Sequence, residues 1–141
     1  MAAIRHAEAN WDGDLVHGNG KVKVGSGAFN EFGVTWAART EQPGGKTSPE
    51  ELIAAAHAAC YAMALSHTLT QDGKKPEHLR VTAACTFDNG KITTMELEVW
   101  GKVPGLDAAG FDEFAKKGEQ GCPVSNALRN NVQIHLKSHL E

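Results

Sequence analysis

Three cysteines, Cys60, Cys85 and Cys122, are the residues of this 141-residue chain whose type could support redox chemistry. A thiolate is the form of cysteine that attacks a peroxide or a disulfide. The number is odd, the spacing is irregular and no Cys-x-x-Cys pair occurs. The pattern therefore predicts neither a disulfide framework nor a thioredoxin-like site. It is typical of a reducing, cytoplasmic setting, in which thiol chemistry is redox or catalytic.

The three cysteines differ in their expected surroundings. Cys122 directly precedes Pro123, which can begin a helix, so its sulfur would lie where unpaired backbone N–H groups favour a thiolate. Cys60 lies within an apolar helix, where burial without a cation raises a thiol pKa. Cys85 is an inward residue of an alternating strand and behaves there as a small apolar group. Position alone thus ranks Cys122 above Cys60 as nucleophile, and a packing role remains open for each.

The helix that carries Cys60 has the clearest start signal in the sequence. Ser48 can act as N-cap, Pro49 suits the first helical position, and Glu51 follows the cap by three residues. We expect this helix to end near Thr70. Its middle, residues 54–65, is apolar on every side, which predicts a helix that is buried all round.

The other elements fall into groups of strands and groups of helices. Strands are predicted over 21–24, 32–39, 81–87, 95–99 and 132–136, and further helices over 107–119 and 123–129. Asp88-Asn89-Gly90 is a strong hairpin signal between two of the strands. Because strands and helices do not alternate, we predict an α+β fold with mainly antiparallel sheets and a long buried central helix. By length, residues 1–141 form one domain.

Composition excludes several functional classes. The chain has 14 basic and 17 acidic residues, a net charge of -3 and no run of Lys or Arg, so nucleic acid is not an expected partner. The longest apolar run, residues 52–65, is too short to span a bilayer, and no signal-like segment opens the chain. The histidines show no ligand spacing. We therefore expect no membrane association, no metal and no cofactor.

Two long segments resemble the OsmC/Ohr family of organic hydroperoxide reductases, named for osmotically inducible protein C and organic hydroperoxide resistance protein. They are TSPEELIAAAHAAC at 47–60 and GCPVSNAL at 121–128. The segment Asn10-Trp11-Asp12-Gly13-Asp14 and the Val103–Asp107 turn extend the similarity over most of the chain. His57, within Ala56-His57-Ala58-Ala59-Cys60, resembles the OsmC branch more than the Ohr branch.

The resemblance implies a cysteine-based peroxidase and reverses the order of the two cysteines. Cys60 would be peroxidatic, attacking an organic hydroperoxide and becoming a sulfenic acid, and Cys122 would resolve it by forming a disulfide. Hydrogen peroxide is a further expected substrate. The resemblance also implies an intertwined homodimer and a dithiol reductant of the lipoyl type.

A positive charge is the next requirement, since a thiolate in an apolar place needs one. The family pattern has an arginine shortly before the Pro-Glu-Glu helix start, and here that residue is Arg39. Glu50 would orient Arg39 as an ion pair. The alternatives are a helix-start carboxylate for Glu50 and a solvated strand-end charge for Arg39.

The length of the predicted helix separates the expected ion pair from Cys60 of the same chain. Glu50 and Cys60 are ten residues apart on one predicted helix, so their Cα atoms differ by about 15 Å along its axis. We therefore expect a second copy of the chain to supply Arg39 and Glu50, in two symmetric sites at a C₂ interface.

Other residues near the expected site could act in more than one way. His57 lies one turn before Cys60 and could tune its thiol, or it could be a hydrogen-bonded core histidine. Tyr61, Phe111 and Phe114 could line an apolar pocket, which would favour organic hydroperoxides over hydrogen peroxide.

Two other functions remain open at this point. One is a non-catalytic redox-sensing or binding dimer on the same scaffold. The other is a thiol-disulfide exchange protein. Both would keep the cysteine pair, and peroxide consumption distinguishes them from a peroxidase.

Overall fold

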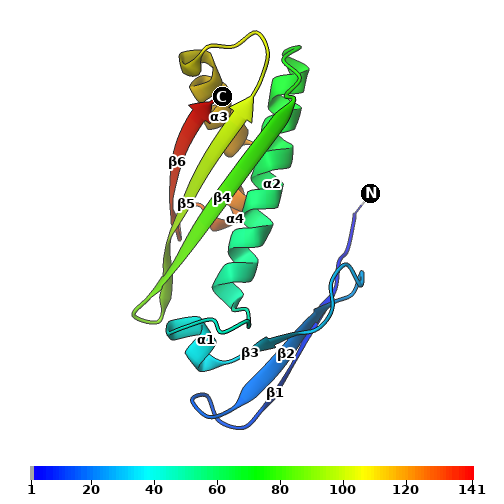
Figure 1. Ribbon diagram of the computed structural model, residues 1–141, viewed down its shortest axis with the longest axis vertical. Helices are drawn as coiled ribbons and strands as arrows, with labels where there is room; N and C mark the ends of the chain where they lie inside the picture. Colours follow the sequence, from blue (N-terminus) through cyan, green and yellow to red (C-terminus); the bar gives the residue numbers. More distant parts are fainter. Residues whose placement is uncertain (1) are drawn as a thin grey trace. The chain divides into compact units, whose positions relative to one another are not determined.

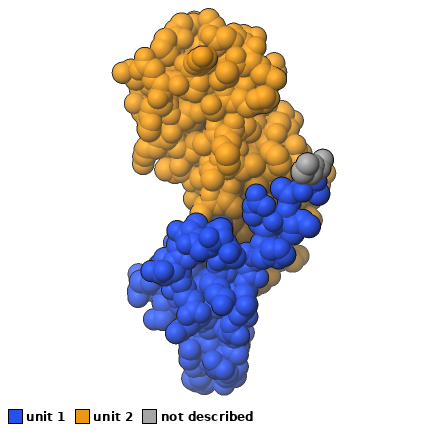
Figure 2. Space-filling view, turned by 90° about the vertical axis from the view of Figure 1, so that its right-hand side faces the viewer, with its two compact units in different colours: residues 1–52 blue, residues 53–141 orange. Residues whose placement is uncertain are grey.

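The chain folds into two compact units. A computed structural model describes residues 2–141. The first unit ends at Leu52 and the second begins at Ile53 (Figure 2). That the whole chain is one domain stays a prediction.

The first unit holds a three-stranded antiparallel sheet. Its strands are β1 (Ala7–Asp12), β2 (Asn19–Val24) and β3 (Phe32–Val34), in that order. The strand predicted over 32–39 is correct only as far as Val34, since helix α1 (Trp36–Thr40) follows. The reason is a local cap: the Thr35 hydroxyl accepts a hydrogen bond from the Ala38 N–H at 3.0 Å. This cap makes Arg39 a helical residue.

Helix α2 (Pro49–Gln71) begins where the sequence predicted. The Ser48 hydroxyl accepts a hydrogen bond from the Glu51 N–H at 3.1 Å, and the Thr47 hydroxyl donates to the Glu51 carboxylate at 2.8 Å. The long central helix is thus confirmed, and it starts with a well-satisfied first turn.

One face of α2 is uncovered in this chain. His57, Tyr61 and Leu65 are fully buried, whereas Met63 is 69% exposed. The alanines at 55, 56 and 59 are also exposed. The expectation of a helix buried all round is therefore wrong for the single chain, because the sheet and the other helices of the second unit pack against one side of α2 only. By length and composition α2 could also cross a membrane, but core helices of soluble proteins meet the same criterion.

The second unit has a mixed three-stranded sheet beside α2 (Figure 1). Its strands are β4 (His78–Asp88), β5 (Lys91–Lys102) and β6 (Gln133–Leu140). The predicted hairpin is confirmed: Asn89 and Gly90, with φ of 53° and 79°, form the two-residue turn between β4 and β5, as a type I′ turn requires. β6 pairs with β5 in parallel, because the chain between them crosses over through α3 (Ala108–Gln120) and α4 (Pro123–Leu128).

The core of the second unit lies between α2, the sheet and α3. It is centred on Tyr61, Leu65 and Leu69 of α2 and on Met95, Leu97 and Val99 of β5. Helix α3 approaches α2 closely, since a Cβ at Gly118 would lie 3.0 Å from the Leu65 Cα.

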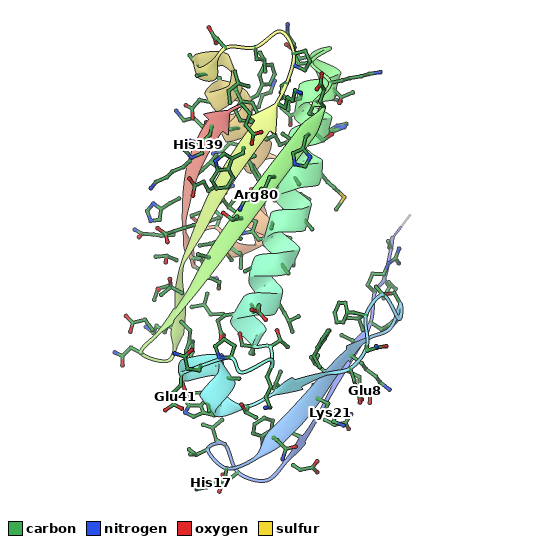
Figure 3. The ribbon with its side chains drawn as sticks, in the orientation of Figure 1. Glu8, His17, Lys21, Glu41, Arg80 and His139 are labelled. Carbon is green, nitrogen blue, oxygen red and sulfur yellow. The ribbon has the colours of Figure 1, made fainter. Side chains whose placement is uncertain are left out.

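The opposite face of the sheet carries an interlocked set of side chains. The Arg80 guanidinium lies 4.5 Å from the Trp100 ring centroid, and His139 stacks on the same ring at 5.2 Å. Figure 3 labels Arg80 on β4 and His139 on β6. These contacts link all three strands and stabilise the sheet against which α2 packs.

An ion pair fastens α4 to the end of α3. Arg129 donates to the two Glu119 carboxylate oxygens at 3.0 and 3.2 Å, and also to the Glu119 carbonyl and the Asn126 side chain. Glu119 is only 6% exposed. A buried carboxylate with a bidentate arginine is a geometrically specific link.

We predict that Arg129→Ala lowers the free energy of unfolding by about 1–3 kcal/mol, because Glu119 would keep its burial and lose its charge-assisted partners. Urea unfolding at fixed protein concentration measures the change. Lys116→Ala is the control: it removes an exposed Lys116–Asp112 pair of 2.9 Å on the same helix and should cost less than about 1 kcal/mol. Equal losses in the two variants would contradict a specific role for the buried pair.

Candidate functional site

Cys60 and Cys122 lie in contact in the second unit. Their thiols interact with each other, although they come from α2 and from the residue before α4. Cys122 is completely buried, and Cys60 is partly exposed. Cys85 lies elsewhere, on β4, where it packs against the core. The structure therefore brings together the two cysteines that the sequence singled out.

Backbone N–H groups at the start of α4 interact with both sulfur atoms. Cys122 is the N-cap residue, and its Sγ accepts a hydrogen bond from the Ser125 N–H at 3.5 Å. The Val124 N–H interacts with the Cys60 sulfur. These are N–H groups that a helix leaves unpaired at its first turn. The predicted helix start at Pro123 is thus confirmed, and it points at the middle of α2.

The surroundings of Cys60 oppose its ionisation. Burial has the largest effect and raises the pKa of its thiol. The Val124 N–H lowers the pKa, the neighbouring Cys122 raises it, and the pKa stays above its usual value. Within the second unit, Cys60 is therefore held as a thiol.

Arg39 and Glu50 form a bidentate ion pair in the first unit. Nε and Nη2 of Arg39 each donate to one Glu50 carboxylate oxygen at 2.9 Å. Glu50 is 6% exposed, and the guanidinium carbon lies 5.8 Å from the centroid of the Trp36 ring. The expected contact between the two residues is present, and it fixes the orientation of the guanidinium.

A cavity of about 380 Å³ opens beside this ion pair within the first unit. Its lining is mostly apolar and comes from Trp11, Leu15, Val34, Thr35, Trp36, Arg39 and Pro49. The aromatic residues proposed from the sequence lie elsewhere: Tyr61 and Phe111 are fully buried core residues, and Phe114 packs against the core. Trp11 belongs to a segment whose similarity to the family was visible in the sequence, and that signal could have identified it.

His57 is a buried histidine with one hydrogen bond. Its Nε2 lies 2.7 Å from the Ser125 hydroxyl oxygen, and its Nδ1 has no partner among residues 2–141. Burial lowers the pKa of the imidazole, which favours the neutral ring. The hydrogen-bonded core histidine is thus the alternative that the structure matches. Among the described residues, no cluster of three or more His, Cys, Asp or Glu side chains could hold a metal ion.

Comparison with known proteins places these features in a family. The family model described as OsmC-like protein matches residues 42–137. Peroxiredoxin OsmC of Escherichia coli is 39% identical over 98% of this chain and all of its own length. An organic hydroperoxide resistance protein of Xanthomonas axonopodis is 34% identical over 66% of this chain and 67% of its own.

Solved structures agree with the sequence matches. An organic hydroperoxide resistance protein from Elizabethkingia anophelis superposes over the full length of both chains, with a TM-score of 0.72 and 28% identity. An OsmC-like protein from Mycoplasma pneumoniae has the same fold, with a TM-score of 0.75 at 14% identity. This chain therefore belongs to the OsmC/Ohr family of soluble, cysteine-based peroxidases.

Proposed function

We propose that this protein reduces organic hydroperoxides to alcohols, with Cys60 as the peroxidatic and Cys122 as the resolving cysteine. The observation that carries the proposal is the contact between the two thiols at the start of α4. The names of the relatives, a peroxiredoxin and an organic hydroperoxide resistance protein, support the same reaction.

The difference in exposure supports the order of the two cysteines. Cys122 is completely buried, whereas Cys60 is partly exposed. A dissolved peroxide therefore reaches Cys60 first. The Cys60 thiolate attacks one peroxide oxygen, the O–O bond breaks, and the alkoxide takes a proton and leaves as the alcohol. The sulfur is oxidised to a sulfenic acid.

Resolution needs only the neighbouring sulfur. Cys122 attacks the Cys60 sulfur, the S–O bond breaks, and the hydroxide leaves as water with the proton of the Cys122 thiol. The resulting disulfide is reduced by a dithiol, which becomes a disulfide itself. We propose a lipoyl-type dithiol for this step and a cytoplasmic location, where glutathione and thioredoxin keep protein thiols reduced.

The raised pKa of Cys60 is the obstacle to the first step. Burial holds this sulfur as a thiol, so the reaction requires a fixed cation beside it. Arg39, oriented by Glu50, is such a cation. Because Glu50 and Cys60 lie on one continuous helix, their Cα atoms are about 15 Å apart along its axis.

We therefore propose a homodimer in which Arg39 of the partner subunit stabilises the Cys60 thiolate. The uncovered face of α2 supports a second copy as its occupant. It carries Met63 and three exposed alanines, small side chains that allow another helix to approach closely. Two symmetric sites would result.

The cavity beside Arg39 supports an organic substrate. Its two tryptophans, with Leu15, Val34 and Pro49, suit a hydrocarbon body, and Arg39 provides the polar group at its wall. Hydrogen peroxide is too small to cover these apolar surfaces, so they would stay in contact with water when it binds. We therefore expect a higher kcat/KM for cumene hydroperoxide than for hydrogen peroxide.

Cysteine variants test the reaction. Cys60→Ser should consume cumene hydroperoxide only at the background rate in the presence of excess dithiol, because the attacking sulfur is gone. Cys122→Ser should consume the first equivalent and then accumulate sulfinic acid at Cys60, detected by mass spectrometry. Cys85→Ser, which changes the third cysteine on β4, should keep wild-type turnover.

Two results would contradict the proposal that this protein is a peroxidase. One is a wild-type protein that does not consume cumene hydroperoxide, and the other is unchanged turnover by Cys60→Ser. An inactive wild type that still exchanges disulfides with a model substrate would favour the exchange protein. An inactive wild type without exchange would favour a redox-sensing or binding dimer.

Mixed dimers test the shared site. Cys60→Ser and Arg39→Met should each be inactive, and their equimolar mixture should recover about a quarter of wild-type activity. Half of the dimers are then mixed, and each of these has one intact site. A mixture of Cys60→Ser and Cys122→Ser is the control, since both cysteines must lie in one chain, and it should show no recovery. Absence of recovery in the first mixture, with subunit exchange verified by mass spectrometry of tagged chains, would rule out a site shared between subunits.

A further inference from the structure

The hydrogen bond between His57 and Ser125 joins α2 directly to α4. Both side chains are 0% exposed, and the bond between Nε2 and Oγ is 2.7 Å long. His57 lies one helical turn before Cys60 on α2. The bond therefore ties the turn of α2 next to one reactive sulfur to the helix that carries the other.

Ser125 connects this bond to the second sulfur. Its hydroxyl contacts His57, while its own backbone N–H donates to the Cys122 Sγ at 3.5 Å. A shift of Ser125 would thus move the N–H group that holds the Cys122 side chain. The N–H of Val124, the preceding residue, interacts with Cys60, so the same shift would also loosen the contact between α4 and α2.

A purely packing role explains His57 poorly. The ring is fully buried, yet Nδ1 has no partner among the described residues. Burying an unpaired polar atom is unfavourable, and an apolar side chain of similar size would avoid that penalty. The hydrogen bond to Ser125 is the feature of His57 that an apolar side chain could not supply.

We propose that His57 and Ser125 are positioning residues for resolution, holding Cys122 so that its sulfur can attack the sulfenic acid at Cys60. The inference rests on the proposed peroxidase. The attack requires the Cys122 sulfur to approach opposite the departing oxygen, and a small misplacement slows such a step strongly. The first attack on the peroxide does not use the Cys122 sulfur, so it should depend much less on this hydrogen bond.

Single-turnover kinetics of Ser125→Ala separate the two steps. With one equivalent of cumene hydroperoxide, peroxide loss reports the first attack, and acid quenching followed by alkylation and mass spectrometry reports disulfide formation. We expect the first rate to stay within about twofold of wild type and the second to fall about tenfold or more. Sulfinic acid at Cys60 should then increase under excess peroxide.

Three further variants separate positioning from general destabilisation. Ser138→Ala makes the same chemical change and removes a hydrogen bond of 2.8 Å to Asp112, between β6 and α3, so it should leave both rates unchanged. His57→Leu should behave like Ser125→Ala. His57→Gln keeps an amide nitrogen that can reach the Ser125 hydroxyl, and it should restore part of the disulfide-formation rate. This last variant also gives a readout if Ser125→Ala does not fold.

The outcomes are distinguishable. Disulfide formation at the wild-type rate in Ser125→Ala and His57→Leu would overturn the inference and leave the peroxidase intact. Equal slowing of both steps would also overturn it, because the hydrogen bond would then stabilise the fold without acting on resolution. Failure of the wild-type protein to consume peroxide would overturn the proposed function and the inference together.

Discussion

The packing of the first turn of α4 against the middle of α2 is the contact on which the candidate site depends. Two adjacent backbone N–H groups, those of Val124 and Ser125, each interact with a different cysteine sulfur. Neither group has a partner within its own helix, because the first turn of a helix leaves its N–H groups unpaired. The sulfur atoms are the partners of these donors, and the Glu119–Arg129 ion pair ties the C-terminal end of α4 to the end of α3.

Charge imposes the second constraint. The contact that brings the cysteines together also removes Cys60 from water, and the pKa of its thiol rises. Reactivity and burial are therefore in conflict within the second unit. The first unit contains the complementary part: a guanidinium whose direction is fixed by a buried carboxylate and whose flank is covered by Trp36. Neither unit by itself has both the Cys60 sulfur and the Arg39 guanidinium, and the proposed homodimer would bring the two groups together.

Much of the fold could be predicted because its signals are local. The cap at Ser48, the Asn89-Gly90 turn and the helix start at Pro123 each depend on a few adjacent residues. The error at 32–39 was also local: β-branched and aromatic residues favoured a strand, but the Thr35 cap turned the chain into α1. The uncovered face of α2 could not be predicted, since periodicity shows that a helix is apolar and not which neighbours cover it.

The candidate site also has one part that could be predicted from the sequence and one part that could not. Family resemblance identified the cysteines, Arg39 and Glu50, and the contacts within each pair are present. The bond between His57 and Ser125 joins residues far apart in the sequence, and no local pattern indicates such a pair. The lining of the cavity was missed for a related reason, because large aromatic residues serve equally well in a core and in a pocket.

The parallel pairing of β6 with β5 has a consequence for the synthesis of the protein. α3, Cys122 and α4 all lie in the crossover that this pairing closes, and non-local strand pairing forms late because a long loop must first be ordered. A nascent chain that has emerged only as far as β5 already contains Cys60 but lacks the sulfur that would protect it. Under the proposed reaction, the Cys60 thiol is exposed to irreversible oxidation until the last strand has docked, and completion of the fold then protects it.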